Sequence, residues 1–123
     1  MKMIPLFKVR NMAEAIDFYT GILDLTLKYP EATAEEGVID LVKEELELQL
    51  TIFEGNYLFG SVVNIRVDEV DDLFKKYLER GLDISNKQGS PVHQGPTDQS
   101  WGMREFYITD KDGNTLRFCK PIE

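Results

Sequence analysis

The segment NMAEAIDFYTGIL, residues 11–23, carries the pattern that decides the fold. Asn11 stands three residues before Glu14, which is the arrangement of a capping box at the start of a helix. Apolar side chains then recur at the spacings i, i+3, i+4 and i+7 and form one stripe: Met12, Ala15, Ile16 and Tyr19. The segment therefore predicts an amphipathic helix that packs one face against a core.

The same spacing occurs again 58 residues further along the chain. The second stripe lies in DEVDDLFKKYLERG, residues 68–81, and consists of Val70, Leu73, Phe74 and Tyr77. Gly81 follows as a residue that favours the end of a helix. An internal repeat of this length predicts two similar modules within a chain of 123 residues.

Strand-like segments accompany both helices in the same order. In the first half they are MIPLFKV (3–9), LTLKY (25–29), VIDLVK (38–43) and LELQLTIF (46–53). In the second half they are SVVNIRV (61–67), LDISNKQ (82–88), MREFYITD (103–110) and NTLRFCK (114–120). Each half thus follows the order β-α-β-β-β, with module 1 at about residues 1–55 and module 2 at about residues 61–123 of a single domain.

One helix per module is too little to cover both faces of a four-stranded sheet. We therefore expect an α+β fold in which two curved mixed sheets turn their uncovered faces toward a cleft. The last two strands are expected to form a hairpin over DKDGN, residues 110–114. In this turn Gly113 tolerates a positive φ and the Asp112 side chain can bond to nearby backbone.

Charge and composition exclude several classes of protein. Fourteen Lys and Arg oppose 22 Asp and Glu, so the net charge is −8, which disfavours a nucleic-acid partner. The chain has no apolar run long enough for a membrane span, and its N-terminal residues do not resemble a signal peptide. Its single cysteine, Cys119, cannot form an internal disulfide. We expect a cytoplasmic protein. Its acidic balance indicates either simply a soluble surface or an attraction for cationic partners or ligands.

The inventory of reactive side chains argues against catalysis. The only histidine is His93, so the chain alone cannot supply the two histidines of the usual non-haem iron site. No phosphate-binding loop or dinucleotide-binding motif occurs, and no pair of acids stands out for acid–base work. The sequence predicts no catalytic residue, no metal site and no cofactor.

Aromatic side chains near glycine-rich loops point to binding instead. Trp101, the only tryptophan, follows the loop SPVHQGPTDQS, residues 90–100. It is either a core residue beside a loop or a flat surface offered to a ligand. Tyr57 and Phe59 lie in EGNYLFG, residues 54–60, and are candidates for the same role. His93 is either exposed to solvent or a polar contact to the ligand.

Two segments resemble the bleomycin-resistance proteins of the vicinal-oxygen-chelate, or glyoxalase-like, superfamily. They are MAEAIDFYTGILDL, residues 12–25, and DQSWGMREFYITDKDGNTLRF, residues 98–118. The resemblance extends over essentially the whole chain. It implies two βαβββ modules in a homodimer, with modules paired within a chain or exchanged between chains. Each of the two clefts at the dimer interface is then built from both chains.

The resemblance also bears on metal binding. Metal-dependent relatives carry ligands on the first and last strand of each module, at positions that correspond here to Ile4, Gln49, Val62 and Arg117. None of these is a histidine or a carboxylate, although a glutamine is a conceivable weak ligand. The resemblance therefore implies a member that binds no metal and catalyses no reaction.

In the resistance proteins, the tryptophan of the second segment stacks on the planar bithiazole of the drug. This implies a stacking role for Trp101, with Gly102 allowing close approach of the backbone. The family also places aromatic residues in the loop before its third strand, whereas EATAEEG, residues 31–37, has none. Tyr57 and Phe59 are candidates to replace them. Arg104 and Glu105 match the family too, and an ion pair along the strand is the simplest interpretation of both.

Together these features predict a protein that binds and sequesters a small, planar, cationic molecule, such as a bleomycin-type antibiotic, without changing it. An enzyme of the same superfamily, such as a lyase or dioxygenase, is one alternative. Stoichiometric bound metal would distinguish it. A binder of an endogenous metabolite is another, and a co-purified ligand would distinguish that.

Overall fold

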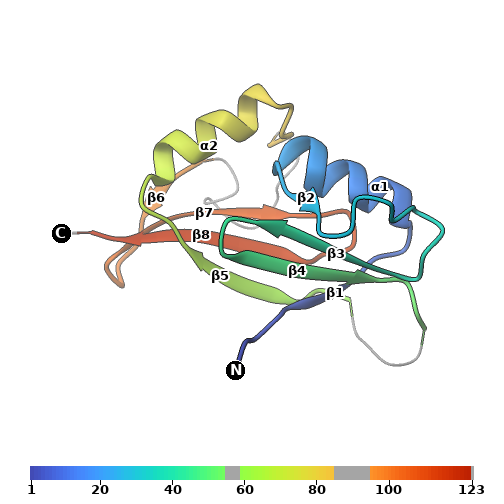
Figure 1. Cartoon of the computed structure of the whole chain (residues 1–123). Helices are drawn as coiled ribbons and strands as arrows, with labels where there is room; N and C mark the ends of the chain where they lie inside the picture. The colour runs from blue at the N-terminus through green and yellow to red at the C-terminus, as the bar shows by residue number, and fades with distance from the viewer. Residues whose placement is uncertain (55–58, 85–94, 123) are drawn as a thin grey trace. The chain divides into compact units, whose positions relative to one another are not determined.

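The computed structural model describes residues 1–54, 59–84 and 95–122, and its elements are shown in Figure 1. The chain divides into two compact units. The first contains residues 1–61 together with 110–114, and the second contains residues 62–109 together with 115–123. No helix in the described part of the chain is both long and apolar enough to cross a membrane.

The first unit holds one four-stranded mixed sheet and one helical segment. Its elements are β1 (Leu6–Lys8), α1 (Met12–Ile16), the π-helix η1 (Asp17–Ile22), β2 (Thr26–Leu27), β3 (Val38–Lys43) and β4 (Leu46–Thr51). The strand order is β1-β4-β3-β2, with β1 parallel to β4 and the other pairs antiparallel. The predicted order β-α-β-β-β is therefore confirmed for this unit.

The helical segment begins as predicted but changes character half-way. The Asn11 side chain accepts a hydrogen bond of 3.0 Å from the Glu14 backbone N–H, which confirms the N-cap. From Asp17 the helix widens into η1, and Leu23 N bonds to Phe18 O at 3.2 Å, five residues back. Thr20 contributes to the change, because its hydroxyl donates to Ile16 O at 2.7 Å and competes with the backbone for that carbonyl.

The core of the first unit lies between this helical segment and one face of the sheet. Its fully buried side chains include Phe7, Tyr19, Leu23, Ile39, Leu41 and Leu50. The rings of Phe7 and Tyr19 pack with their centroids 6.4 Å apart. Alternation along β4 buries Leu48 and Leu50, as the period of two predicted.

The second unit repeats the first. Its elements are β5 (Val62–Arg66), α2 (Val70–Glu79), β6 (Thr97–Asp98), β7 (Met103–Thr109) and β8 (Thr115–Pro121). The strand order is β5-β8-β7-β6, again with one parallel pair, β5 and β8. These two mixed sheets with their helices confirm the predicted α+β class.

Helix α2 ends as the sequence predicted, but no strand follows it in residues 82–84. Gly81 has a φ of 103°, Leu82 N bonds to Tyr77 O and Gly81 N bonds to Leu78 O, which together make a Schellman motif. Residues 82–84 form no strand, and residues 85–88 lie outside the described residues. Among the described residues, the next strand after α2 is β6. A strand of two residues is too short to show an alternating pattern in the sequence. Only its pairing with β7 defines β6 as a strand.

Aromatic rings fill the core of the second unit. Phe106 and Phe118 stack with centroids 5.0 Å apart on neighbouring strands. From α2, Phe74 packs against Phe106 at 5.1 Å and Tyr77 packs against Phe118 at 5.6 Å. The stripe predicted from the spacing of apolar residues therefore faces the sheet, with Val70 and Tyr77 buried.

The turn between β7 and β8 belongs to the first unit. Gly113 has the expected positive φ, 87°, but the local bonds come from Asp110 rather than Asp112. Asp110 Oδ1 accepts from the backbone N–H groups of Asp112 and Asn114 at 2.8 and 3.0 Å. Asp110 Oδ2 accepts from the Tyr19 hydroxyl at 2.7 Å. Burial and this carboxylate raise the pKa of Tyr19 well above its usual value.

Candidate ligand-binding site

In each unit the helix packs on one face of the sheet, and polar side chains occupy the other, helix-free face. Strand pairing places Asn64, Arg117 and Tyr107 side by side on this face in the second unit. It places Leu6, Gln49 and Asp40 side by side in the first. A helix-free face that is polar need not belong to the core, so its side chains are available for binding.

A connected cluster on the helix-free face of the second unit consists of Glu105, Tyr107 and Arg117. Arg117 donates to the Tyr107 hydroxyl, which donates to Glu105 Oε1 at 3.1 Å. The Arg117 guanidinium lies 4.5 Å from the Tyr107 ring centroid, and its Nη2 lies 3.7 Å from Glu105. Glu105 is only 3% exposed. Burial and the Glu105 carboxylate raise the pKa of Tyr107, although Arg117 acts in the opposite direction.

Trp101 is not a core residue, because 58% of its surface is exposed. It lies in the turn that joins β6 to β7. Gln99 N bonds to Met103 O at 2.8 Å, and Gly102 N bonds to Gln99 O at 3.1 Å, so three residues close the hairpin. Such a turn usually ends in a left-handed residue, and Gly102 has a φ of 84°. The indole is thus held out by backbone geometry rather than by core packing.

Gly102 is needed in this turn for its backbone conformation. A methyl group built on it would meet no atom within 4 Å, so crowding does not require glycine there. The positive φ does require it, because an L side chain strains that conformation. The backbone oxygen of Gly102 also accepts from Ile122 N at 2.9 Å, which fixes the turn to the end of β8.

Phe59, in the first unit, is exposed but already in contact with two cations. The Arg10 guanidinium lies 3.8 Å from its ring centroid, and Lys8 Nζ lies 5.1 Å away. Tyr57 and His93, the other residues that the sequence suggested for the ligand, lie outside the described residues.

Phe53 is an exposed aromatic residue that the sequence analysis did not single out. The loop before β3 has no aromatic residue of its own, yet the Phe53 ring rests on Gly37 at the end of that loop. A Cβ on Gly37 would come within 2.3 Å of Phe53 Cζ, so glycine leaves the space that the ring fills. The ring still has 54% of its surface exposed. The contact follows from the adjacent ends of β3 and β4, where Val38 pairs with Thr51.

The sequence suggested an ion pair between Arg104 and Glu105, but Arg104 has other partners. Neighbouring residues on a strand point to opposite faces. Arg104 instead holds Asp71 at the start of α2 with two bonds of 2.9 and 2.8 Å, and it holds Asp98 of β6 at 2.9 Å. These acids raise the pKa of Arg104 far above its usual value. The network ties β6, and with it the Trp101 turn, to α2.

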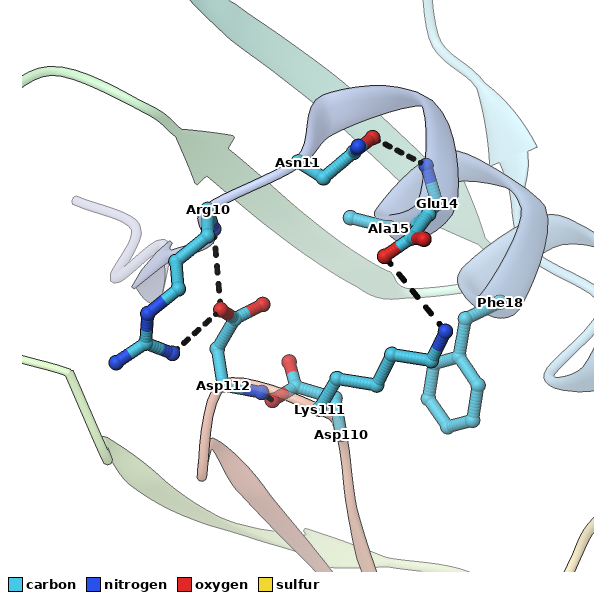
Figure 2. A pocket seen from close by; sticks show the side chains of 8 residues that line it. All are labelled: Arg10, Asn11, Glu14, Ala15, Phe18, Asp110, Lys111 and Asp112. Carbon is cyan, nitrogen blue, oxygen red and sulfur yellow. Dashed lines mark hydrogen bonds and ion pairs between the residues drawn. The ribbon is translucent and has the colours of Figure 1, made fainter.

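A small pocket of about 150 Å³ lies in the first unit between the start of α1 and the β7–β8 turn. Ala15 and Phe18 form its apolar lining, and Figure 2 shows the charged side chains around it. Arg10 donates to Asp112 at 2.9 Å, and Lys111 pairs with Glu14 at 3.6 Å. No sequence pattern indicated this pocket, because its two sides are about 100 residues apart along the chain and meet only in the fold.

A family model described as the Glyoxalase/Bleomycin resistance protein/Dioxygenase superfamily matches residues 6–118. This span includes every helix and strand except the last few residues of β8. The chain belongs to this superfamily. No curated protein matches the sequence.

Solved structures of the superfamily share the fold at low sequence identity. A bleomycin resistance determinant encoded on the transposon Tn5 is 18% identical, with a TM-score of 0.76 over 98% of both chains. A bleomycin-binding protein complexed with bleomycin is 21% identical, with a TM-score of 0.74 over 98% of both chains. A bleomycin-binding protein from Streptomyces verticillus, complexed with copper(II)-bleomycin, is 17% identical, with a TM-score of 0.70 over 96% of this chain and 93% of that one.

Three of the four positions that the resemblance assigned to metal ligands lie in strands, namely Gln49, Val62 and Arg117. Gln49 pairs with Leu6, and its amide donates to Asp40 at 2.8 Å. Arg117, the equivalent position in the other sheet, pairs with Asn64. In the part of the chain that the structure describes, no group of three His, Cys, Asp or Glu side chains is arranged to hold a metal ion.

Proposed function

We propose that this superfamily member binds and sequesters a small, planar, cationic molecule, such as a bleomycin-type antibiotic, without making or breaking a bond. The observation that carries the proposal is the exposure of Trp101 on a turn whose geometry is fixed by Gly102. A large aromatic ring held away from the core is well suited to stack on a planar ligand.

The charge of the chain supports a cationic ligand. With a net charge of −8, the protein attracts cations over a distance of about one Debye length, roughly 8–10 Å at physiological salt. An indole face also attracts cations directly. Sequestration needs no more than this, because protection then depends on affinity and on the number of protein copies.

Each unit offers an exposed aromatic ring whose position depends on a glycine. Trp101 does so in the second unit, and Phe53 on Gly37 does so in the first. We propose that each of these rings can stack on a planar ligand and that the protein acts as a homodimer. Tyr57 and His93 stay in the proposal as residues of the sequence-predicted site.

Side-chain chemistry supports binding without catalysis. The resemblance assigns Ile4, Gln49, Val62 and Arg117 to the positions that hold metal in catalytic relatives. An arginine with a fixed positive charge repels a metal ion, and the cluster of Glu105 and Tyr107 holds Arg117 in place on that face.

The deciding experiment is a fluorescence titration with metal-free and copper-loaded bleomycin. Trp101 is the only tryptophan, so its emission reports this one position. We expect saturable quenching at one drug molecule per chain, with a cationic chromophore that does not bind as the control for absorbed light. Calorimetry on the same sample checks the stoichiometry.

Three other outcomes would change the proposed function. No saturable quenching and no heat of binding would exclude bleomycin. A ligand that co-purifies in native mass spectrometry would then identify a metabolite binder. Stoichiometric metal after purification, lost on chelation, would overturn the non-catalytic proposal.

A further inference from the structure

The pocket between the start of α1 and the β7–β8 turn occurs where the two repeats differ in sequence. At the offset of 58 residues that relates the modules, Ala15 corresponds to Leu73, and Phe18 corresponds to Lys76. Ala15 is small where the repeat has a larger side chain, and Phe18 is apolar where the repeat has an exposed lysine. The first unit therefore has a space and an apolar surface that the repeated fold does not require.

Phe18 lies beside the core of the first unit rather than within it. The buried residues of its helical segment are Met12, Ala15 and Tyr19. Phe18 is half-buried and meets the Tyr19 ring edge-on, with the centroids 5.1 Å apart. Its ring and the Ala15 methyl group form the apolar lining of the pocket, whose volume is about 150 Å³. An apolar cavity of this size has room for a group of about six heavy atoms, since one of similar volume binds benzene.

The β7–β8 turn forms the opposite wall of the pocket, and hydrogen bonds hold it in place. Asp110 accepts from the Tyr19 hydroxyl at 2.7 Å and from two backbone N–H groups of the turn. Asp112 Oδ1 accepts from the Arg10 backbone N–H at 3.0 Å and from Arg10 Nη1 at 2.9 Å. These charged groups bond to one another, so their role is to fix the shape of the pocket.

Glu14 and Lys111 form a looser charged pair at the rim. Lys111 Nζ lies 3.6 Å from Glu14 Oε2, and the two side chains are 79% and 56% exposed. An exposed ion pair of this kind stabilises a fold very little, so a ligand can replace either partner at low cost. Figure 2 shows the Lys111 side chain extending from the turn toward Glu14 and Phe18. One acid and one base thus lie together at the edge of an apolar pocket.

We propose that this pocket binds a free α-amino acid with an aliphatic side chain. The ammonium of the ligand pairs with Glu14, its carboxylate pairs with Lys111, and its side chain packs on Phe18. A zwitterion replaces one exposed ion pair by two charge-assisted contacts, and burial of its alkyl group adds hydrophobic stabilisation. A ligand with a single charge makes only one of these contacts. The inference goes beyond the proposed function and does not depend on Trp101.

The test uses the full chain labelled with ¹³C at the alanine methyl groups and titrated with L-leucine at constant pH and ionic strength. We expect the Ala15 signal, identified by its absence in Ala15→Leu, to shift saturably. The signal of Ala13, which is exposed on the same helix, should stay in place. Isoamylamine lacks the carboxylate and isocaproate lacks the ammonium, so each should bind about tenfold more weakly than leucine. Equal affinity for either probe would overturn the assignment of a zwitterion.

Matched variants test each part of the site. Glu14→Gln and Lys111→Met should each weaken the binding of leucine about tenfold. Their controls are Glu79→Gln and Lys75→Met, at exposed residues of α2, which should leave the affinity unchanged. Ala15→Leu fills the pocket and should abolish the heat of binding in calorimetry. The two rim variants keep the test decisive even if Ala15→Leu does not fold.

The wild-type titration can overturn the proposal by itself. An Ala15 signal that does not move with leucine, or that drifts linearly like the Ala13 signal, would mean that the pocket binds no aliphatic amino acid. Quenching of Trp101 by bleomycin is measured separately, so failure of one proposal does not decide the other.

Discussion

The two sheets share a topology but carry different chemistry on their helix-free faces. Both have one parallel pair, β1 with β4 and β5 with β8, at equivalent places in the strand order. In the first sheet, Glu47 is bridged by Lys2 and Lys28 at 2.8 and 3.1 Å, and Lys8 Nζ lies 5.1 Å from the Phe59 ring centroid. In the second, Glu105 is bonded to Tyr107 and lies beside Arg117.

This difference shows which part of a repeat is constrained. The apolar face must match its helix, so Tyr19 and Tyr77 occupy the same place in the two units. The polar face does not hold the core together, so its residues can change without loss of the fold. The equivalent positions Gln49 and Arg117 therefore differ in charge while their strands keep the same register.

The largest effect should follow from breaking the cluster of the second sheet. Arg117→Met should lower the free energy of unfolding by about 3 kcal/mol, since it leaves a buried carboxylate without its cation. The expected loss of stability is at the low end of the range for a broken buried ion pair. The reason is that Arg117 is 30% exposed and Tyr107 still donates to Glu105. Urea unfolding measures it. Arg66→Met, at an exposed arginine of β5, is the control. Adding Glu105→Gln should restore most of the stability, and no recovery would contradict this account.

The next largest effect concerns the two exposed rings. Trp101→Ala and Phe53→Ala should each weaken bleomycin binding by about 2 kcal/mol, the usual size for an aromatic contact at an interface. Unfolding free energies should change by less than about 0.5 kcal/mol, because both rings are exposed. Calorimetry and urea unfolding on both variants make the comparison. A fall of several kcal/mol in the stability of Trp101→Ala would mean that its ring supports the fold.

Substitutions at two glycines distinguish the effect of backbone strain from the effect of side-chain packing. Gly102→Ala should cost about 1 kcal/mol of stability, because its φ of 84° strains an L residue. Gly37→Ala should instead displace the Phe53 ring and reduce binding as Phe53→Ala does, with less loss of stability. Gly21→Ala, where a Cβ meets nothing within 4 Å, is the control. Unchanged binding in Gly37→Ala would remove Phe53 from the proposed site.

The smallest effect is a pH dependence in the first sheet. Hydrogen bonds from Lys2 and Lys28 lower the pKa of Glu47 in the folded state. Its contribution to stability is therefore fully present above the unfolded-state pKa of about 4.3 and is lost as the pH falls through the lower folded value. The difference in melting temperature between wild type and Lys28→Met should be small near neutral pH and should vanish in acid. A difference that grows on acidification would show that Lys28 acts through another group.

Local signals in the sequence predicted most of the fold. Asn11 capped its helix as expected, Gly81 ended the second one, and β3 has the predicted bounds, Val38–Lys43. These features depend on contacts within a few residues. The π-helix from Asp17, the two-residue β6 and the role of Asp110 were not predicted, because each depends on competition between hydrogen bonds that periodicity does not reveal.

The sequence by itself determined the repeat, the single tryptophan beside a turn and the absence of a two-histidine metal set. Only the tertiary structure decided that Trp101 is exposed, that Phe53 rests on Gly37 and that Arg117 lies beside Glu105. The physical reason is the range of the interactions. Helix stripes and turns are set by neighbours along the chain, whereas exposure and charge pairing depend on which distant strands the fold brings together.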